Sequence, residues 1–238
     1  MAKFAIIIKE STDLAKNKLA QFAENKTFKH MFEPTMDEVW AKDFHLIGKW
    51  GKEFFKNDNP IVLELGCGKG EYTVDLAKQN PNKNFVGIDI KGARMWRGAK
   101  TVDEEKLPNV AFLRTRVEFV ASFFGANEID EIWFTFSDPQ PKKPNKRLTS
   151  PYYLNIYKPL LKPNAVIHLK TDSRLLFNYT IEQVEANNYT MEACVFDVYD
   201  RDWNKLSDHD KAIMKIKTFY EAIWLKKKFA INYLRFRI

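Results

Sequence analysis

The sequence predicts an α/β fold built around one mostly parallel sheet, and three features of the chain support this prediction. Short apolar runs recur along its middle, with helical or turn-rich stretches between them. One of these runs leads into a turn with glycine at three alternate positions, the form of a strand-to-helix crossover in open α/β sheets. The last part of the chain breaks the alternation with two aromatic, β-branched runs. We therefore expect a doubly wound, Rossmann-like sheet that ends in an antiparallel hairpin.

The composition is that of a globular chain that can bury a large core. Of the 238 residues, 45% are hydrophobic and 29% are charged. The longest apolar run near the start, Phe4 to Ile8, is too short for a signal-peptide core or a membrane span. We expect a cytoplasmic protein that does not cross a membrane and that works as a monomer or a homodimer.

Charge and metal-binding residue types narrow the partners. The net charge of +7 favours a polyanion such as RNA or DNA through neutralisation of its phosphates, although many basic proteins bind no nucleic acid. The two cysteines, Cys67 and Cys194, belong to no CxxC or Cys/His cluster, and the four histidines are scattered. The pattern therefore predicts neither a disulfide framework nor a bound metal.

Residues 1–58 are predicted to form a helical extension that packs on the core. A helical pattern around Leu14 to Phe22 comes first, and a second helix follows in which Thr35 and Glu38 can form a capping box. Apolar residues recur at helical spacing along this second helix, namely Met36, Val39, Trp40, Ile47, Trp50 and Phe54. A turn-rich junction, residues 57–60, then separates the extension from the main domain, residues 59–238.

Seven strands are expected in the main domain. The five apolar runs that alternate with helices are residues 61–65, 85–88, 110–113, 132–136 and 166–169, and they predict the parallel part of the sheet. The antiparallel hairpin is predicted for residues 189–199 and 229–236.

The glycine turn, residues 63–70 (LELGCGKG), is the sharpest local signal for a bound cofactor. Gly66, Gly68 and Gly70 allow a tight turn and a close approach of a ligand to the backbone. A dinucleotide fingerprint needs a further glycine where Glu71 stands, and that carboxylate disfavours a pyrophosphate. S-adenosylmethionine carries no phosphate and is cationic at its sulfonium and ammonium groups, so Glu64 suits it. A nicotinamide cofactor and a plain structural turn remain as alternatives.

Two further segments place charged side chains at the carboxyl edge of the predicted sheet. Asp89 ends the second strand, where an acidic residue receives ribose hydroxyls in doubly wound folds. After the fourth strand, residues 136–147 (FSDPQPKKPNKR) form a loop that two prolines stiffen, with Asp138 in front of four positive charges. Such a loop can accept hydrogen bonds from a base edge through its carboxylate while its cations hold phosphates. A solvated surface loop is the alternative interpretation.

With these segments in order, the chain resembles the tRNA (guanine-N7-)-methyltransferase family. Members of that family join a LEIGxGxG-type cofactor turn to an FxDPxPK segment and a TxxE segment near the C-terminus. The corresponding residues here are 63–70, 136–142 (FSDPQPK) and 218–221 (TFYE). The resemblance covers roughly residues 60–238, and three motifs in order are much more specific than any one of them.

The resemblance implies a class I S-adenosylmethionine-dependent methyltransferase fold, S-adenosylmethionine as cofactor, tRNA as substrate and 7-methylguanosine as product. It implies that Asp138 is the catalytic carboxylate at the junction of cofactor and substrate. The implied cofactor contacts are Glu64, Gly66, Gly68, Gly70, Asp89, Asp138 and the position of Arg116. The implied tRNA or guanine contacts are Lys142, Asp172, Thr218, Phe219, Tyr220 and Glu221.

Two positions depart from the family pattern. Arg116 stands where an acidic residue usually serves the adenine end of the cofactor, so Glu118 or a backbone amide is expected to take that role. Gln140 stands where tryptophan is common, which removes a stacking surface that Phe136 or Tyr220 can replace.

Alternatives of other classes remain open from the sequence. These are a methyltransferase for another acceptor, a catalytically silent RNA-binding relative and a nicotinamide oxidoreductase.

Overall fold

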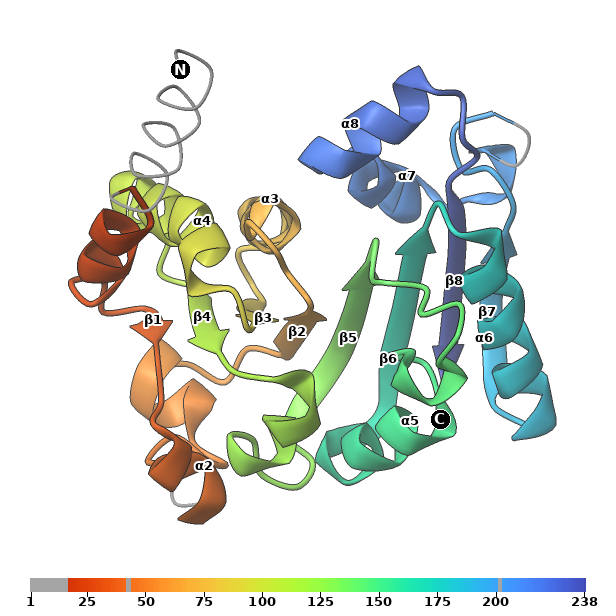
Figure 1. The fold of residues 1–238 in the computed structure, drawn as a ribbon. Helices are drawn as coiled ribbons and strands as arrows, with labels where there is room; N and C mark the ends of the chain where they lie inside the picture. Colours follow the sequence, from red (N-terminus) through yellow and green to blue (C-terminus); the bar gives the residue numbers. More distant parts are fainter. Residues whose placement is uncertain (1–16, 42–43, 201–202) are drawn as a thin grey trace, which may run out of the picture.

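The computed structural model describes residues 17–41, 44–200 and 203–238, so the start of the first predicted helix, at Leu14, lies outside the described residues. Within them, eight strands form one sheet in the order β1-β4-β3-β2-β5-β6-β8-β7 (Figure 1). The strands are β1 (Met31–Phe32), β2 (Ile61–Leu65), β3 (Asn84–Asp89), β4 (Val110–Arg114), β5 (Ile129–Thr135), β6 (Leu161–Thr171), β7 (Thr190–Val195) and β8 (Asn232–Arg237).

The centre of the sheet is β2, which pairs in parallel with both β3 and β5. All five of its residues are buried, as expected for an apolar run in the middle of a parallel sheet. The chain places β3 and β4 on one side of β2 and then crosses to place β5 and β6 on the other. The strand order therefore reverses at the carboxyl end of β2, which is where open α/β sheets bind ligands.

The antiparallel end of the sheet was predicted from the last two strand patterns, and this is confirmed. Strand β8 runs antiparallel to both of its neighbours and lies between β6 and β7. The two strands are not joined by a tight turn, because residues 196–231 between them carry the helices α7 (Asp208–Met214) and α8 (Phe219–Lys226). This long connection brings α8 over the strand ends at the upper edge of the sheet (Figure 1).

Helices cover both faces of the sheet (Figure 1). Successive side chains of β2 point to opposite faces, so Val62 packs in a cluster with Tyr72 while Leu63 packs in another with Phe177. The remaining described helices are the one at residues 17–25, α2 (Met36–Ala41), α3 (Glu71–Gln79), α4 (Gly92–Glu105), α5 (Pro151–Tyr157) and α6 (Arg174–Ala186). Short helical turns occur at Trp50–Phe55, Val117–Ser122, Pro144–Lys146, Lys158–Leu160 and Trp203–Lys205. No helix of the described residues is long and apolar enough to cross a membrane.

The segment before β2 differs from its predicted form. The capping box at the start of α2 is confirmed, because the amide of Thr35 donates to the Glu38 carboxylate at 2.6 Å and the amide of Glu38 donates to the Thr35 hydroxyl at 3.3 Å. The single long helix was wrong. Gly48 has φ +69°, outside the helical region, and the Glu128 carboxylate accepts the amides of Gly48 and Trp50.

The predicted apolar stripe of that helix is consequently divided. Trp50 is fully buried, whereas Met36 and Trp40 on α2 are 53% and 68% exposed. The eighth strand, β1, also comes from this segment and pairs in parallel with β4 through Met31 and Phe112. Two residues are too few for an alternating pattern, which is why the sequence did not predict β1.

Candidate active site at the carboxyl edge of the sheet

A cleft of about 850 Å³ opens at the carboxyl ends of the parallel strands. Its volume lies in the range of small-molecule sites in proteins. Loops that follow β2, β3, β4, β5 and β6 all contribute to its wall, and α8 adds one side chain. The lining includes Gly66, Asp89, Lys91, Arg94, Thr115, Arg116, Glu118, Phe136, Ser137, Asp138, Gln140, Lys146, Tyr153, Asp172 and Trp224.

The glycine turn combines an open side with a packed side. Gly66, Gly68 and Gly70 have φ of +84°, +59° and +72°, a region that strongly favours glycine. A Cβ at Gly68 would meet nothing within 4 Å, so the backbone there is open to a ligand. A Cβ at Gly70 would lie 2.5 Å from the Phe112 ring, so this glycine serves the packing of the turn on the sheet.

Asp89 fixes the geometry between the glycine turn and the end of β3. One of its carboxylate oxygens accepts the amide of Gly68 at 2.9 Å, and the other accepts the amide of Lys91 at 2.8 Å. Each oxygen keeps a lone pair for a further donor. Asp89 therefore joins two loops of the cleft and still presents acceptors to it.

Glu64 lies beneath the glycine turn and is not among the described residues that line the cleft. Its carboxylate accepts hydrogen bonds from the hydroxyls of Thr73 on α3 and Thr135 on β5. Burial raises the pKa of Glu64 from 4.5 to about 7, although both hydroxyls favour the ionised form. Its contact with a cofactor stays a prediction, while its observed partners join three elements under the turn.

The loop after β4 presents an ion pair to the cleft. Arg116 is exposed and lies 3.0 Å from the Glu118 carboxylate. Partial burial would raise the pKa of Glu118, but the hydrogen bonds from Arg116 and from its own backbone outweigh this, and the pKa is lowered. Burial and the nearby Glu118 carboxylate raise the pKa of Tyr153 to about 12. An acidic side chain two residues after Arg116 thus lies in the same cleft, and its contact with the adenine end of a cofactor stays a prediction.

Asp138 stands in the cleft on a loop that the fold holds in an unusual conformation. Phe136 and Gln140 on either side of it have positive φ of 52° and 43°, values that non-glycine residues seldom adopt. The Asp138 carboxylate accepts the Gln140 amide at 2.9 Å. The buried Arg147 donates to the Pro139 carbonyl at 2.9 Å and lies over the Tyr179 ring. The loop is therefore fixed from behind while the Asp138 side chain remains exposed.

Asp172, which directly follows β6, lines the same cleft as Asp138. It is half-buried, and this burial raises its pKa. The sequence placed both carboxylates at strand ends of one sheet edge, and the structure brings them to one cavity. The Asp138 loop also carries Lys142 and Lys146. Lys146 lines the cavity, whereas Lys142 is exposed outside it.

The TxxE segment has a different place. The Thr218 hydroxyl accepts the Glu221 amide at 3.2 Å and caps α8. Glu221 is fully buried and lies 2.8 Å from the ammonium of Lys170, itself fully buried on β6. Neither Thr218 nor Glu221 is among the described residues that line the cleft. The side chains of Phe219 and Tyr220 lie outside the described residues.

Several functional candidates were missed from the sequence. Lys91, Arg94 and Trp224 line the cleft, and none of them was assigned to the site from the sequence. Lys170 reads as one polar residue in an apolar strand, and nothing in the sequence pairs it with Glu221. In the part of the chain that the structure describes, no three His, Cys, Asp or Glu side chains form a potential metal site.

Comparison with known proteins assigns the family. A family model described as "Putative methyltransferase" matches residues 58–234. The chain is 49% identical to a tRNA (guanine-N7-)-methyltransferase of Bacteroides thetaiotaomicron, over 94% of this chain and 87% of that protein. It is 48% identical to a tRNA (guanine-N7-)-methyltransferase of Christiangramia forsetii, over 94% and 99%.

The fold has solved relatives as well. The crystal structure of the 16S rRNA methyltransferase KamB superimposes with a TM-score of 0.59 at 16% identity, covering 79% of this chain and 91% of that one. This likeness confirms the methyltransferase fold. Because nearly half of the residues agree with curated members along almost the whole chain, the protein belongs to the tRNA (guanine-N7-)-methyltransferase family.

Proposed function

We propose that this protein transfers a methyl group from S-adenosylmethionine to N7 of a guanine in tRNA and so forms 7-methylguanosine. The observation that carries the proposal is the meeting of Asp138 and Asp172 with the glycine turn and Asp89 in one cleft of a chain from this family. We infer that the reaction takes place in the cytoplasm, because tRNA is the substrate.

The cofactor half of the cleft suits S-adenosylmethionine, whose role is to supply an electrophilic methyl group. Asp89 offers carboxylate acceptors to ribose hydroxyls, and the open backbone at Gly68 admits the amino-acid end. Glu118 can accept from the adenine amine in place of the acidic residue that Arg116 replaces. Glu64 lies beneath the turn with a pKa of about 7, and its ionised form favours a cationic ligand over a phosphate.

The substrate half is suited to hold a guanine by its edge. A carboxylate can accept hydrogen bonds from guanine N1-H and from the exocyclic amine, and both Asp138 and Asp172 face the cleft. Guanine N7 already has a free lone pair and loses no proton on methylation, so a strong general base is not required. Alignment of the two reactants is the main task, and such ordering supplies up to ~7–11 kcal/mol in favourable systems. A nearby carboxylate also stabilises the positive charge that develops on the purine.

The cations of the cleft fit the RNA rather than the cofactor. Lys91, Arg94 and Lys146 line the cleft, and Lys142 is exposed on the Asp138 loop. S-adenosylmethionine has no phosphate for these side chains, whereas tRNA has one for every nucleotide. They are therefore proposed to neutralise phosphates and to set the orientation of the RNA.

The test is product analysis. Purified protein is incubated with labelled S-adenosylmethionine and unmodified tRNA, and the RNA is digested to nucleosides. Labelled 7-methylguanosine is the expected product. Another methylated nucleoside would support the cofactor assignment and contradict guanine N7 as the acceptor. Cofactor binding without transfer to RNA would contradict tRNA as the substrate.

A further inference from the structure

A base held by its edge also needs a surface against its face. The loop that carries Asp138 has Gln140 where a large aromatic side chain would provide that surface. Among the side chains that the structure describes, three aromatic ones line the cleft: Phe136, Tyr153 and Trp224. Tyr153 is only 5% exposed and lies near Glu118, at the cofactor end. Phe136 is held beside β5 by its own backbone, whose amide donates to the Lys170 carbonyl at 2.9 Å.

Trp224 reaches the cleft from another direction. It belongs to α8, in the long connection between β7 and β8, and α8 stands above the ends of β5 and β6 (Figure 1). Asp138 and Asp172 follow those same two strands. We propose that Trp224 is the stacking surface for the target guanine, whose edge the two carboxylates hold. This proposal deepens the proposed function and rests on it for the identity of the base.

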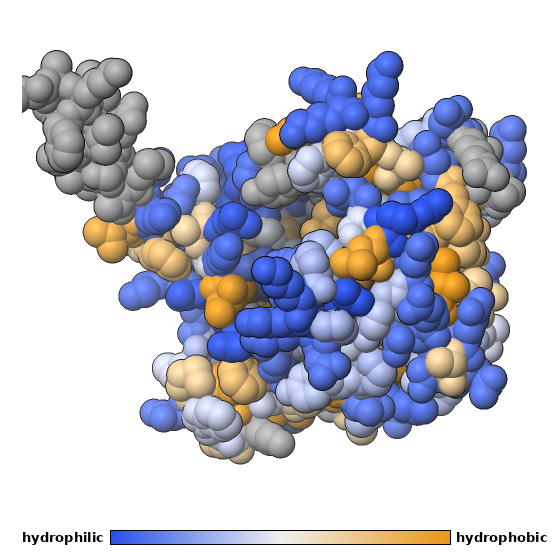
Figure 2. Space-filling model, turned by 45° about the vertical axis from the view of Figure 1, so that its right-hand side comes forward, coloured by the Kyte–Doolittle hydropathy of each residue, from blue (hydrophilic) through white to orange (hydrophobic). Residues whose placement is uncertain are grey.

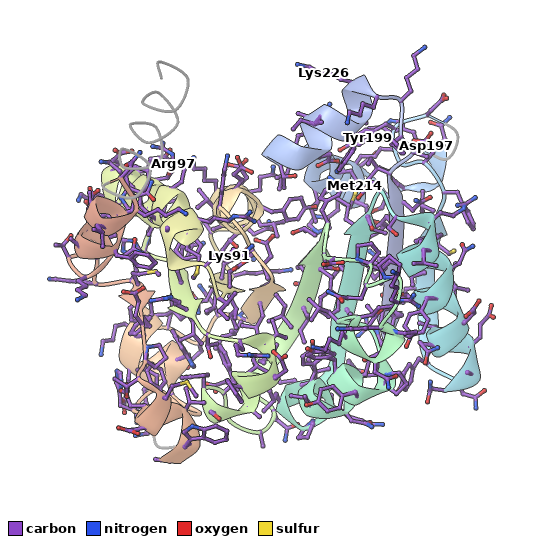
Figure 3. All side chains as sticks on the ribbon, viewed as in Figure 1. Lys91, Arg97, Asp197, Tyr199, Met214 and Lys226 are labelled. Atoms are coloured by element: carbon purple, nitrogen blue, oxygen red, sulfur yellow. The ribbon has the colours of Figure 1, made fainter. Side chains whose placement is uncertain are left out.

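A buried cluster fixes the helix that carries Trp224. The Lys170 ammonium on β6 lies 2.8 Å from the Glu221 carboxylate and 2.9 Å from the Ile216 carbonyl. The Tyr199 hydroxyl donates to the same carboxylate at 2.6 Å. Figure 3 shows Tyr199 and Met214 beneath α8. Since both charges are fully buried, displacing α8 would leave an uncompensated charge in the protein interior.

The cluster and the tryptophan are coupled by helix geometry. Glu221 and Trp224 are three residues apart in α8 and so lie on neighbouring positions of its surface. On the sheet, Lys170 lies near the end of β6, and Asp172 follows two residues later, directly after the strand. The same ion pair therefore sets the position of the indole relative to the strand that carries Asp172. A stacking surface held in this way does not have to be ordered when the RNA binds.

The environment of the indole agrees with a role at the RNA interface. Trp224 is partly buried and packs against the core cluster that contains Tyr233. Its ring meets the Phe229 ring edge-on at a centroid distance of 5.5 Å, and the Lys227 ammonium lies over it, 5.0 Å from the centroid. Hydrophilic side chains project from the top of the molecule where α8 lies (Figure 2), and Lys226 points outward there (Figure 3). An aromatic surface beside exposed lysines is the combination that binds a base and its phosphate.

The first test is kinetic and uses three variants. Trp224→Ala should lower kcat/KM for tRNA by roughly ten- to a hundredfold, the range that loss of one stacked base implies. Trp224→Phe keeps a ring and should recover most of this loss, while affinity for S-adenosylmethionine stays unchanged in both. Trp40→Ala removes an exposed tryptophan that does not line the cleft and should behave as the unmodified protein. Unchanged kcat/KM in Trp224→Ala would overturn the proposal, as would equal losses in Trp224→Ala and Trp224→Phe.

The second test does not depend on methyl transfer. Stacking of a base on an indole quenches its fluorescence, so the quenching on addition of tRNA should be smaller in Trp224→Phe than in the unmodified protein. Equal quenching in the two proteins would overturn the stacking role. If the unmodified protein forms no 7-methylguanosine and yet shows quenching that depends on Trp224, the proposed function fails while the stacking surface stands.

Discussion

The two halves of the cleft are assembled in different ways. Most of the cofactor half comes from one stretch, residues 61–89, to which the loop after β4 adds Glu118. Backbone amides tie the stretch together, as in the bond from Gly68 to Asp89. The substrate half comes from three distant segments that bear Asp138, Asp172 and Trp224, and buried side-chain charges hold two of them. The geometry of the cofactor half is therefore determined mainly by local sequence. The geometry of the substrate half depends on contacts between segments that are far apart in the chain.

The largest expected effect concerns the junction of the halves. Asp138→Ala should lower kcat by at least ~100-fold, as the loss of one preorganised electrostatic group does in other enzymes. The melting temperature should hold, because the Asp138 side chain is exposed. Asp89→Ala, its counterpart in the cofactor half, should instead reduce the affinity for S-adenosylmethionine in a calorimetric titration. Undiminished methyl transfer by Asp138→Ala would remove Asp138 from its role.

The next effect tests how the substrate half is held. Glu221→Ala leaves the Lys170 ammonium buried without its carboxylate, so we expect a loss of about 3–5 kcal/mol in the free energy of unfolding. The double variant Lys170→Met/Glu221→Leu should recover part of that loss. Urea unfolding measures both. Glu105→Ala, which breaks an exposed pair with Lys78, is the control and should cost less than ~1 kcal/mol. A loss of stability in the double variant that is as large as, or larger than, the loss in Glu221→Ala would show that the two charges are not coupled.

The third prediction concerns the pH dependence of stability that Glu64, buried beneath the glycine turn, should cause. Between pH 4.5 and about 7 the folded protein keeps a proton on Glu64 that the unfolded chain has released, so this group lowers stability as the pH rises through that window. The full difference is about 3 kcal/mol. Glu64→Gln lacks this titration and can still bond to both threonine hydroxyls. Its stability relative to the unmodified protein should rise from pH 5 to pH 8 in urea unfolding, and a constant difference would contradict the buried-carboxylate account.

The smallest effect concerns phosphate contacts. Lys146→Ala and Lys142→Ala should each weaken tRNA binding modestly and reduce the slope of log K against log salt by about 1. The larger loss is expected for Lys146, which lines the cleft. Lys162→Ala is the control, since Lys162 pairs with Asp130 away from the cleft and should leave the slope unchanged. If neither Lys146→Ala nor Lys142→Ala alters the slope, this loop makes no phosphate contacts.

The same contrast explains what the sequence could predict. Strand β2 was predicted to the residue, because an apolar run that ends in a glycine turn is a complete local signal. Strand β6 was predicted only for its apolar centre, since Leu161–Thr171 includes polar residues whose partners lie elsewhere in the chain. The helix predicted across Gly48 was wrong for a similar reason, because the hydrogen bonds that the Gly48 and Trp50 amides donate to Glu128 span about 80 residues of sequence.

Site residues divide in the same way. Asp89, Asp138 and Asp172 were predicted as cleft residues because each follows a strand, and the carboxyl ends of parallel strands share one edge. Trp224 and Lys170 were missed, because only the folding back of α8 over the sheet gives them their neighbours. The TxxE segment has the sequence pattern of a helix cap, and in the structure Thr218 and Glu221 form the capping box of α8. Its contact with tRNA stays a prediction.

The central claim is that N7 of guanine in tRNA accepts the methyl group, and it can be tested by replacing that atom. Two transcripts of one tRNA are compared, one with guanosine and one with 7-deazaguanosine, in which carbon replaces N7. Labelled 7-methylguanosine is expected from the first transcript and no methyl transfer to the second, which should still bind and compete. Methyl transfer to the 7-deazaguanosine transcript at a similar rate would contradict the claim.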